Sequence, residues 1–210
     1  MNYKKVLILA FGLFKVSSVF SQQQYQHSAN LTNLKNNKLS LELITPSIKK
    51  NTIVFSFPKI IPGTYAVSDY GRFISNLKTV IKDRIMLSTK KLDINQWQII
   101  NASKLHKITY EVEDISDAAQ KHCIPPMAAT IFESEKNVVM NTPGVFGFIE
   151  GMQKLPFQIS FTKPVGFFAS TSLRPTSSTS ARDVFIVSSV NELYDSLIMY
   201  NILDTTTVRA

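Results

Sequence analysis

Apolar and polar residues alternate with a period of two through most of the chain. In residues 39–43, for example, three leucines alternate with Ser40 and Glu42. Alternation of this kind is typical of strands that bury one face. The pattern recurs, with Pro, Asn, Asp or Ser between segments, in residues 39–43, 53–57, 97–99, 108–112, 138–140, 157–161 and 184–187. It predicts an all-β, mainly antiparallel fold of sandwich-like twisted sheets.

One segment has a different spacing. Tyr70, Phe73, Ile74 and Leu77 stand at i, i+3, i+4 and i+7, which is the spacing of one helical face. We therefore expect one short helix within residues 68–80. The single tryptophan, Trp97, lies in a strand pattern, and we expect it to be a core residue rather than a ligand platform.

The first residues have the pattern of a secretory signal. Lys4 and Lys5 precede an apolar run, and residues 19–21 end in small or aliphatic residues before Gln22. We expect a signal peptide over residues 1–21, cleavage between Ser21 and Gln22, and export to the periplasm or medium. The apolar run is short and contains Lys15, so we expect no stable membrane span. Residues 22–37 then read as a polar leader and residues 38–200 as one β-domain.

The net charge and the cysteine content indicate which classes of partner and which kinds of cross-link to expect. The formal charge of +8 falls to +5 without residues 1–21, which contain three lysines and no acid. The cations are scattered and no nucleic-acid motif is present, so we expect no nucleic-acid partner. Cys123 is the only cysteine, which excludes an internal disulfide. Its thiol is either buried and inert, which we favour, or available for an intermolecular bond.

The chain lacks the common catalytic motifs. Its three histidines, His27, His106 and His122, have no histidine partner four residues away, so the helical zinc motif His-Glu-x-x-His is missing. There is also no Gly-x-Ser-x-Gly elbow and no phosphate-binding loop. We expect this chain by itself to hold no metal or cofactor and to be catalytically silent.

The densest run of turn residues and aromatics is residues 57–73. A strand pattern runs into Pro58 and then into the turn signal Pro62-Gly63, followed by Tyr65, Asp69 and further aromatics. Without any comparison to a family, the pattern of residues predicts a strand, then a turn, then a corner packed with aromatic side chains.

The same stretch carries a family resemblance. Pro62-Gly63-Thr64-Tyr65 followed by Asp69-Tyr70-Gly71-Arg72 resembles a signature near the start of the glycyl aminopeptidase family, which are secreted zinc metallopeptidases of the thermolysin-like type. Further matching segments follow in the order of that family: residues 91–97 ending in Trp97, residues 108–112, residues 136–141 with 146–151, and residues 170–173 with 192–196. The resemblance covers roughly residues 40 to 200 and concerns only the amino-terminal, non-catalytic domain.

The resemblance implies a role beside a catalytic domain. Such a domain packs against a zinc metallopeptidase domain, normally in the same chain, and walls one side of its peptide cleft. Residues 201–210 would then be the truncated start of the catalytic domain. Leu197 departs from the family, which usually has proline after the position of Ser196.

Three residues are candidates for the cleft. Asn141 would make amide hydrogen bonds to the substrate, Glu150 would be the counter-ion of a substrate ammonium, and Phe146 would be an apolar wall. We expect the residues of the family signature to have a structural role and not to bind substrate. They are Pro62, Gly63, Tyr65, Asp69, Arg72 and Trp97. Of these, the Tyr65 hydroxyl would make a hydrogen bond that closes a turn of the backbone. The Arg72 guanidinium would donate paired hydrogen bonds to a carboxylate or to backbone carbonyls.

Two alternatives stay open. The chain could be a free-standing secreted module that binds peptide or glycan, which would require an exposed aromatic patch at residues 146–148 or 167–168. It could also be the remnant of a disrupted gene, with a large apolar face where a catalytic domain belonged.

Overall fold

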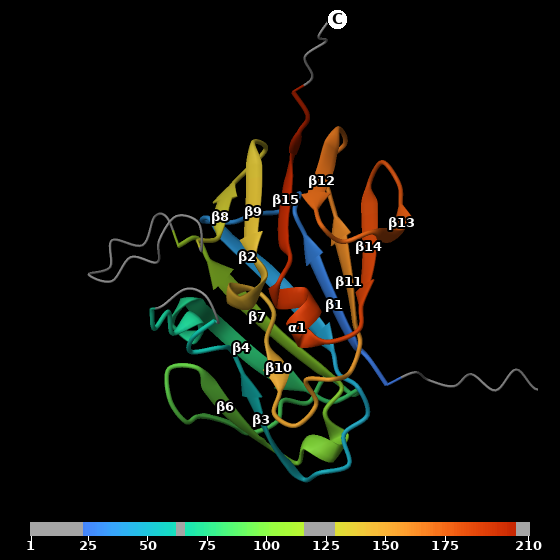
Figure 1. Cartoon of the computed structure of the whole chain (residues 1–210). Coiled ribbons are helices and arrows are strands. Elements are labelled where there is room, and N and C mark those ends of the chain that lie inside the picture. Colours follow the sequence, from blue (N-terminus) through green and yellow to red (C-terminus); the bar gives the residue numbers. More distant parts are fainter. Residues whose placement is uncertain (1–22, 62–65, 116–128, 205–210) are drawn as a thin grey trace, which may run out of the picture.

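A computed structural model describes residues 23–61, 66–115 and 129–204, which form three β-sheets (Figure 1). The largest sheet has seven strands in the order β13 (Pro175–Ser178), β14 (Arg182–Val187), β11 (Phe157–Thr162), β1 (Tyr25–Asn30), β2 (Lys38–Ile44), β7 (Lys107–Glu113) and β4 (Ile74–Val80). One four-stranded sheet contains β10 (Phe148–Ile149), β3 (Thr52–Ser56), β6 (Gln96–Ile100) and β5 (Thr89–Lys91). The other contains β12 (Phe167–Thr171), β15 (Leu197–Ile202), β9 (Asn137–Asn141) and β8 (Ile131–Glu133).

Strand pairing confirms the predicted fold class. Every described strand pair is antiparallel except β1 with β11, which run parallel with Tyr25 opposite Phe157. Helical structure among the described residues is limited to short pieces: α1 (Val190–Tyr194) and the 3₁₀ turns at Tyr70–Phe73, Ala102–Lys104 and Thr142–Gly144. The fold is therefore mainly β with one short α-helix.

The two small sheets cover one face of the large sheet. In Figure 1 the β12–β15–β9–β8 sheet lies over its upper part and the β3–β6–β10 strands over its lower part. Inward side chains meet across these layers, with 5.9 Å between the ring centres of Phe55 on β3 and Tyr110 on β7. The rings of Phe161 on β11 and Tyr200 on β15 are 5.3 Å apart. One apolar core therefore lies between the layers, as the alternating pattern requires.

The helix expected within residues 68–80 is mostly a strand. Only Tyr70–Phe73 is helical, as one 3₁₀ turn, and Ile74–Val80 forms β4 against β7. The register shifts between Ser75 and Lys78, where Asn76 has a positive φ of 52°. Tyr70 and Phe73 lie in the 3₁₀ turn, and the bulge lets Ile74 and Leu77, three residues apart on β4, both pack against the core. The one α-helix lies instead at α1, where the Ser189 hydroxyl accepts a hydrogen bond from the Glu192 amide.

The segment read as a polar leader contains a core strand. Residues 25–30 form β1, which lies between β2 and β11 in the large sheet. Tyr25, His27 and Ala29 point into the core and alternate with exposed polar residues. A histidine and an alanine at inward positions gave this strand too little hydrophobicity to be recognised.

Three tyrosines, two buried and one partly buried, hold the segment that joins the two small sheets. We call Tyr25, Tyr110 and Tyr194 the tyrosine clamp. The Tyr110 hydroxyl donates to the carbonyl of residue 145 at 2.9 Å, and the Tyr194 hydroxyl donates to the Phe146 carbonyl at 2.7 Å. The Tyr25 hydroxyl accepts from the Ile149 amide at 2.9 Å. Burial raises the pKa of all three hydroxyls, so they stay neutral and keep these bonds.

A buried ion pair at the large sheet is joined to the β12–β15–β9–β8 sheet by a tyrosine hydrogen bond. Lys163 Nζ lies 2.8 Å from Asp183 Oδ2, and the two side chains are 5% and 2% exposed. Asp183, on β14, also accepts hydrogen bonds from Ser178 Oγ at 2.6 Å and from the hydroxyl of Tyr200, on β15, at 3.0 Å. The carboxylate is thus fully surrounded by donors, which a buried charge requires.

His27 lies in the core without a hydrogen-bonding partner. Its side chain is 1% exposed, and neither ring nitrogen bonds to a described residue. Its ring stacks 5.8 Å from Phe157 and meets the edge of Phe146 at 5.1 Å. Burial lowers the pKa of His27 from 6.5 to about 3, so the imidazole is neutral in the folded protein at ordinary pH.

Removing one partner of the buried ion pair should be costly. Lys163→Met leaves the Asp183 charge buried without its cation, and we expect a loss of about 3–5 kcal/mol in the free energy of unfolding. Urea denaturation measures this loss. Adding Asp183→Asn removes the stranded charge but keeps an acceptor for Ser178 and Tyr200, so the double variant should recover most of the stability. A single variant no less stable than the double would contradict this account.

Acid should destabilise the fold through His27. Because its folded pKa lies below the unfolded value, its contribution is complete above pH 6.5 and falls by about 1.4 kcal/mol per pH unit between about pH 6.5 and 3. His27→Phe cannot take up this proton, so its unfolding free energy should decline less steeply with acid than that of the unchanged protein. His106→Phe, in a loop, is the matched control and should retain the steep decline. Equal slopes for the His27 variant and the unchanged protein would refute the assignment.

Candidate functional site

Two of the sequence motifs meet through one asparagine. Asn95 Nδ2 donates to Asp69 Oδ1 at 2.8 Å, and the Gly71 amide donates to Asn95 Oδ1 at 3.0 Å. The Asn95 amide in turn donates to Asp93 Oδ1 at 2.7 Å. Asp69 stands in the left-handed region with φ of 46°, a conformation that aspartate tolerates better than most residues. The turn between β5 and β6 is thereby fastened to the loop after β3.

Gly71 is required by this contact. A Cβ at residue 71 would lie 2.3 Å from the carbonyl oxygen of Ile94 and 2.6 Å from Cα of Asn95. Both are backbone atoms, so the clash could not be relieved by a side-chain rotation. The glycine of the Asp69–Arg72 motif therefore allows the close approach of the 93–95 turn.

Next to this junction lies a hollow of about 300 Å³, which we call the motif pocket. It is lined by residues from the loop after β3, the β5–β6 turn and β10: Phe57, Pro58, Lys59, Asp93, Asn95, Gln96, Phe148 and Glu150. Three stretches singled out in the sequence thus contribute to one concave surface. Lys59, Asp93 and Glu150 give it charged groups of both signs, which suits a ligand with a charged end.

Glu150 is an accessible carboxylate at the edge of this pocket. Its backbone amide donates to the Val54 carbonyl at 2.9 Å, which fixes its position beside β3. Its side chain is exposed, and Oε2 accepts a hydrogen bond from Gln153 Nε2 at 2.9 Å. Glu150 also borders a second hollow of about 310 Å³, which includes Lys49 and Lys50. The carboxylate is therefore placed where a cationic group can reach it.

The other two cleft candidates lie elsewhere. Asn141 ends β9, where it pairs with Leu197, and its Nδ2 donates to the Tyr70 hydroxyl at 3.3 Å. Phe146 has no exposed surface, and its carbonyl is held by Tyr194. The ring belongs to the core, so the expectation that it is presented as a wall of the cleft was wrong.

Two of the described signature residues, Trp97 and Arg72, pack against aromatic rings or a lysine. Trp97 is buried on β6, with its ring edge-on to Phe57 at 5.9 Å and Lys91 Nζ 4.8 Å above it. The Arg72 guanidinium stacks 4.7 Å from the centre of the Phe73 ring. Pro62, Gly63 and Tyr65 lie outside the described residues, as do Ser21, Gln22 and Cys123.

The residue that sequence reasoning missed is Asn95. Its motif was quoted for the resemblance, but its amide was given no role. The available signal was the Asp-x-Asn spacing, since such side chains bond to backbone amides two residues on and favour turns. Nothing in the sequence showed that the same amide would reach Asp69 and Gly71.

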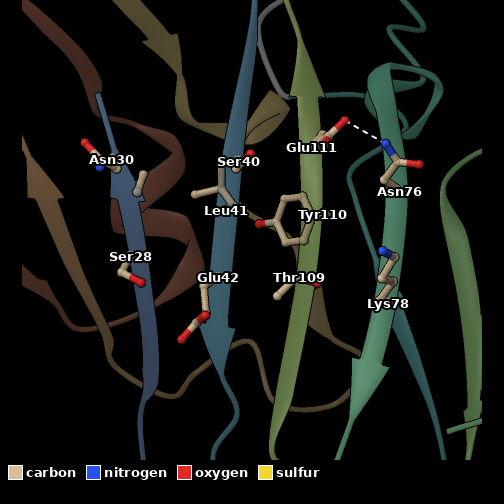
Figure 2. A pocket seen from close by; sticks show the side chains of 11 residues that line it. Ser28, Asn30, Ser40, Leu41, Glu42, Asn76, Lys78, Thr109, Tyr110 and Glu111 are labelled. Atoms are coloured by element: carbon tan, nitrogen blue, oxygen red, sulfur yellow. Dashed lines mark hydrogen bonds between the residues drawn. The ribbon is translucent and has the colours of Figure 1, made fainter. Parts of the chain in front are cut away.

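A larger hollow of about 520 Å³ lies on the outer face of the seven-stranded sheet (Figure 2). Its side chains are mostly polar, and Asn76 Nδ2 donates to Glu111 Oε2 at 2.8 Å. The bulge of β4 at Asn76 bends the edge of the sheet there. None of the predicted site residues lies in this hollow, and its alternating polar side chains are those of a solvated sheet face.

Two further classes of site were sought in the described parts of the chain. No group of three His, Cys, Asp or Glu residues in those parts is placed to hold a metal ion. Phe168, 50% exposed, is the one strongly exposed aromatic among them, so they offer no aromatic patch for the binding-module alternative. No helix in the described residues is long and apolar enough to cross a membrane.

Comparison with known proteins agrees with this architecture. Residues 26–201 match the family described as Peptidase M61 N-terminal domain. The search of curated proteins found no match. Among solved structures, an aminopeptidase N family protein from Idiomarina loihiensis superposes with a TM-score of 0.72 at 16% identity, over 85% of this chain and 29% of that protein.

A second solved structure is less similar. The M1 zinc metallopeptidase from Deinococcus radiodurans, a variant bound to a Tyr-Ser-Ala substrate, matches with a TM-score of 0.46 at 11% identity, over 85% of this chain and 41% of that one. The chain thus spans less than half the length of either protein. Because the family match covers most of its length, the chain belongs to the Peptidase M61 N-terminal domain family.

Proposed function

We propose that this chain is the non-catalytic amino-terminal domain of an exported aminopeptidase-like zinc metallopeptidase and helps to form its substrate cleft. The observation that carries the proposal is the family match over residues 26–201. We further propose that the complete enzyme is similar to the glycyl aminopeptidases. In this role the domain positions the amino terminus of a peptide and excludes water while another domain does the chemistry.

A partly apolar surface offers a place for that other domain. The outer face of the β12–β15–β9–β8 sheet, which we call the exit face, includes Phe168 and Leu197, 50% and 45% exposed. Partly buried neighbours on the same face are Ile131, Val139, Met199, Asn137, Asn141 and Asn201. At the end of this sheet Val165, Ile202 and Leu203 are also exposed. An apolar surface edged by amides is typical of a domain interface.

The position of the exit face supports this assignment. β15 is the last described strand, and in Figure 1 the chain leaves it at the top of the domain. Residues that follow β15 in a longer protein would start beside this face. Asn141 lies on it opposite Leu197, so it would face the partner domain and not the motif pocket.

Zinc would be held by the partner domain. Of the three histidines, His27 is enclosed by aromatic rings and His106 lies alone in a loop beside Lys104. His122 lies outside the described residues. The described side chains do not fit a zinc site, and no step of the proposal passes through a metal in this chain.

Glu150 is the residue we assign to substrate recognition. Its accessible carboxylate at the motif pocket would pair with the free ammonium of a peptide, and such charge-assisted bonds are the stronger hydrogen bonds in proteins. In the longest protein that the gene encodes, Glu150→Gln should raise KM for peptides with a free amino terminus by about tenfold. The fold should be unaffected because the side chain is exposed.

The control is an exposed glutamate away from the pocket, Glu135→Gln, which should leave KM unchanged. Unchanged KM in the Glu150 variant would remove Glu150 from the site while leaving the family assignment intact. If the gene encodes no His-Glu-x-x-His with a later glutamate after residue 210, in frame or one frameshift away, the metallopeptidase proposal itself fails.

Export is the second part of the proposal, and it rests on the sequence pattern of residues 1–21. The mature protein should begin at Gln22, three residues before β1. Mass spectrometry of the protein recovered from the periplasm or medium would measure this. A recovered protein that still begins at Met1 would contradict it.

A further inference from the structure

Three loops meet at the end of the domain that lies farthest from the point where the chain leaves β15 (Figure 1). The Thr45 amide donates to the His106 carbonyl at 3.0 Å, and the Ala102 amide donates to the Asn51 carbonyl at 2.8 Å. The Ile100 amide donates to the Ser88 carbonyl at 3.2 Å. Residues 45–51, 81–88 and 101–106 therefore form one surface, which we call the basic loop surface. It includes a hollow of about 690 Å³. In Figure 1 the chain leaves β15 at the other end.

The charge of this surface is one-sided. It contains five cations and one carboxylate, Asp83, for a net charge of +4 with histidine neutral. The cations are Lys49, Lys50, Lys82, Arg84 and Lys104, and all are exposed. None of them forms an ion pair with a described residue, whereas Lys38, Lys107 and Lys163 do. A positive potential therefore stands open to solvent at this end.

An apolar tip stands within the same surface. Residues 81–85 form a tight turn, in which the Ile81 amide donates to the Ile85 carbonyl and the Arg84 amide to the Ile81 carbonyl, both at 3.0 Å. Ile85 and Met86 follow the charged tip, and each is 61% exposed. Two adjacent large apolar side chains this exposed carry a cost in water, which suggests that another environment receives them.

We propose that the basic loop surface docks on an anionic phospholipid bilayer. Lys and Arg would contact headgroup phosphates while Ile85 and Met86 enter the boundary between headgroups and acyl chains, as in other interfacial proteins. A nucleic acid would match the charge, but it offers no apolar layer for Ile85 and Met86. Docking by this end leaves the exit face free, although Lys49 and Lys50 share a hollow with Glu150. The argument uses only the charges and exposed side chains of the loops, so the inference does not depend on the proposed function.

Vesicle sedimentation tests the electrostatic part. The full chain should bind vesicles of phosphatidylcholine mixed with phosphatidylglycerol more tightly than vesicles of phosphatidylcholine alone, and added salt should weaken this preference. Each cation near such a surface contributes about a fivefold increase in affinity. The combined change Lys82→Gln, Arg84→Gln and Lys104→Gln should therefore lower affinity for the anionic vesicles by about a hundredfold.

The matched control removes three exposed cations outside this surface and its neighbouring strand: Lys35→Gln, Lys136→Gln and Arg174→Gln. It should retain most of the affinity, because only charges that face the bilayer contribute within a Debye length. All chains compared carry the same residues 1–22, so a difference between the two triple variants comes from the surface. Equal losses in both would mean that net charge alone drives binding, and would overturn the proposal.

The apolar tip has its own test. Ile85→Ser with Met86→Ser should lower affinity for the anionic vesicles by about tenfold, and this loss should persist at high salt. Val165→Ser, at the opposite end of the domain, should change nothing. No loss in the tip variant would refute membrane docking, as would duplex DNA binding that is tighter than vesicle binding and unaffected by the tip.

Discussion

The structure depends on burying one face of a seven-stranded sheet. Most of the aromatic and aliphatic side chains of that sheet lie on one side, and in Figure 1 each small sheet covers only part of it. Both are used, so the segment between them must cross the core with its backbone polar groups away from water. The tyrosine clamp solves this problem, because the three hydroxyls bond to that backbone inside the core. The aromatic content of the chain is thus as much a hydrogen-bonding requirement as a packing one.

The buried ion pair has a related role between the large sheet and the β12–β15–β9–β8 sheet. Two sheets can make good hydrophobic contact in several relative positions. A carboxylate that accepts hydrogen bonds from Lys163, Ser178 and Tyr200 can do so in only one of these positions. Such a group adds little net stability, since desolvation offsets most of the attraction. Its effect here is to fix how the exit face lies relative to the rest of the domain.

Sequence reasoning recovered the fold class because period-two alternation is a property of each strand alone. It failed where tertiary contacts decide. β1 was missed because His27 is polar by type yet lies in the core. β4 was taken for a helix because a 3₁₀ turn followed by a bulged strand gives apolar residues at helical spacing. For the site, the order of the motif segments indicated a family, but it did not predict that the segments meet in space, and their contact through Asn95 is not visible in the sequence. Phe146 was misplaced because an aromatic beside glycines and proline resembles a presented loop residue whether it points outward or inward.

Chain order has a consequence for when this domain becomes complete. β1 lies near the amino terminus, between β2 and β11. β11 runs parallel to β1 and comes more than a hundred residues later in the chain. The large sheet therefore cannot close until nearly the whole domain has been synthesised, and a high contact order of this kind makes folding slow. A chain that remains unfolded while its first part emerges from the ribosome is one that a translocation channel can still thread. Late closure of the sheet would therefore be compatible with the proposed export, in which the chain crosses a membrane before it folds.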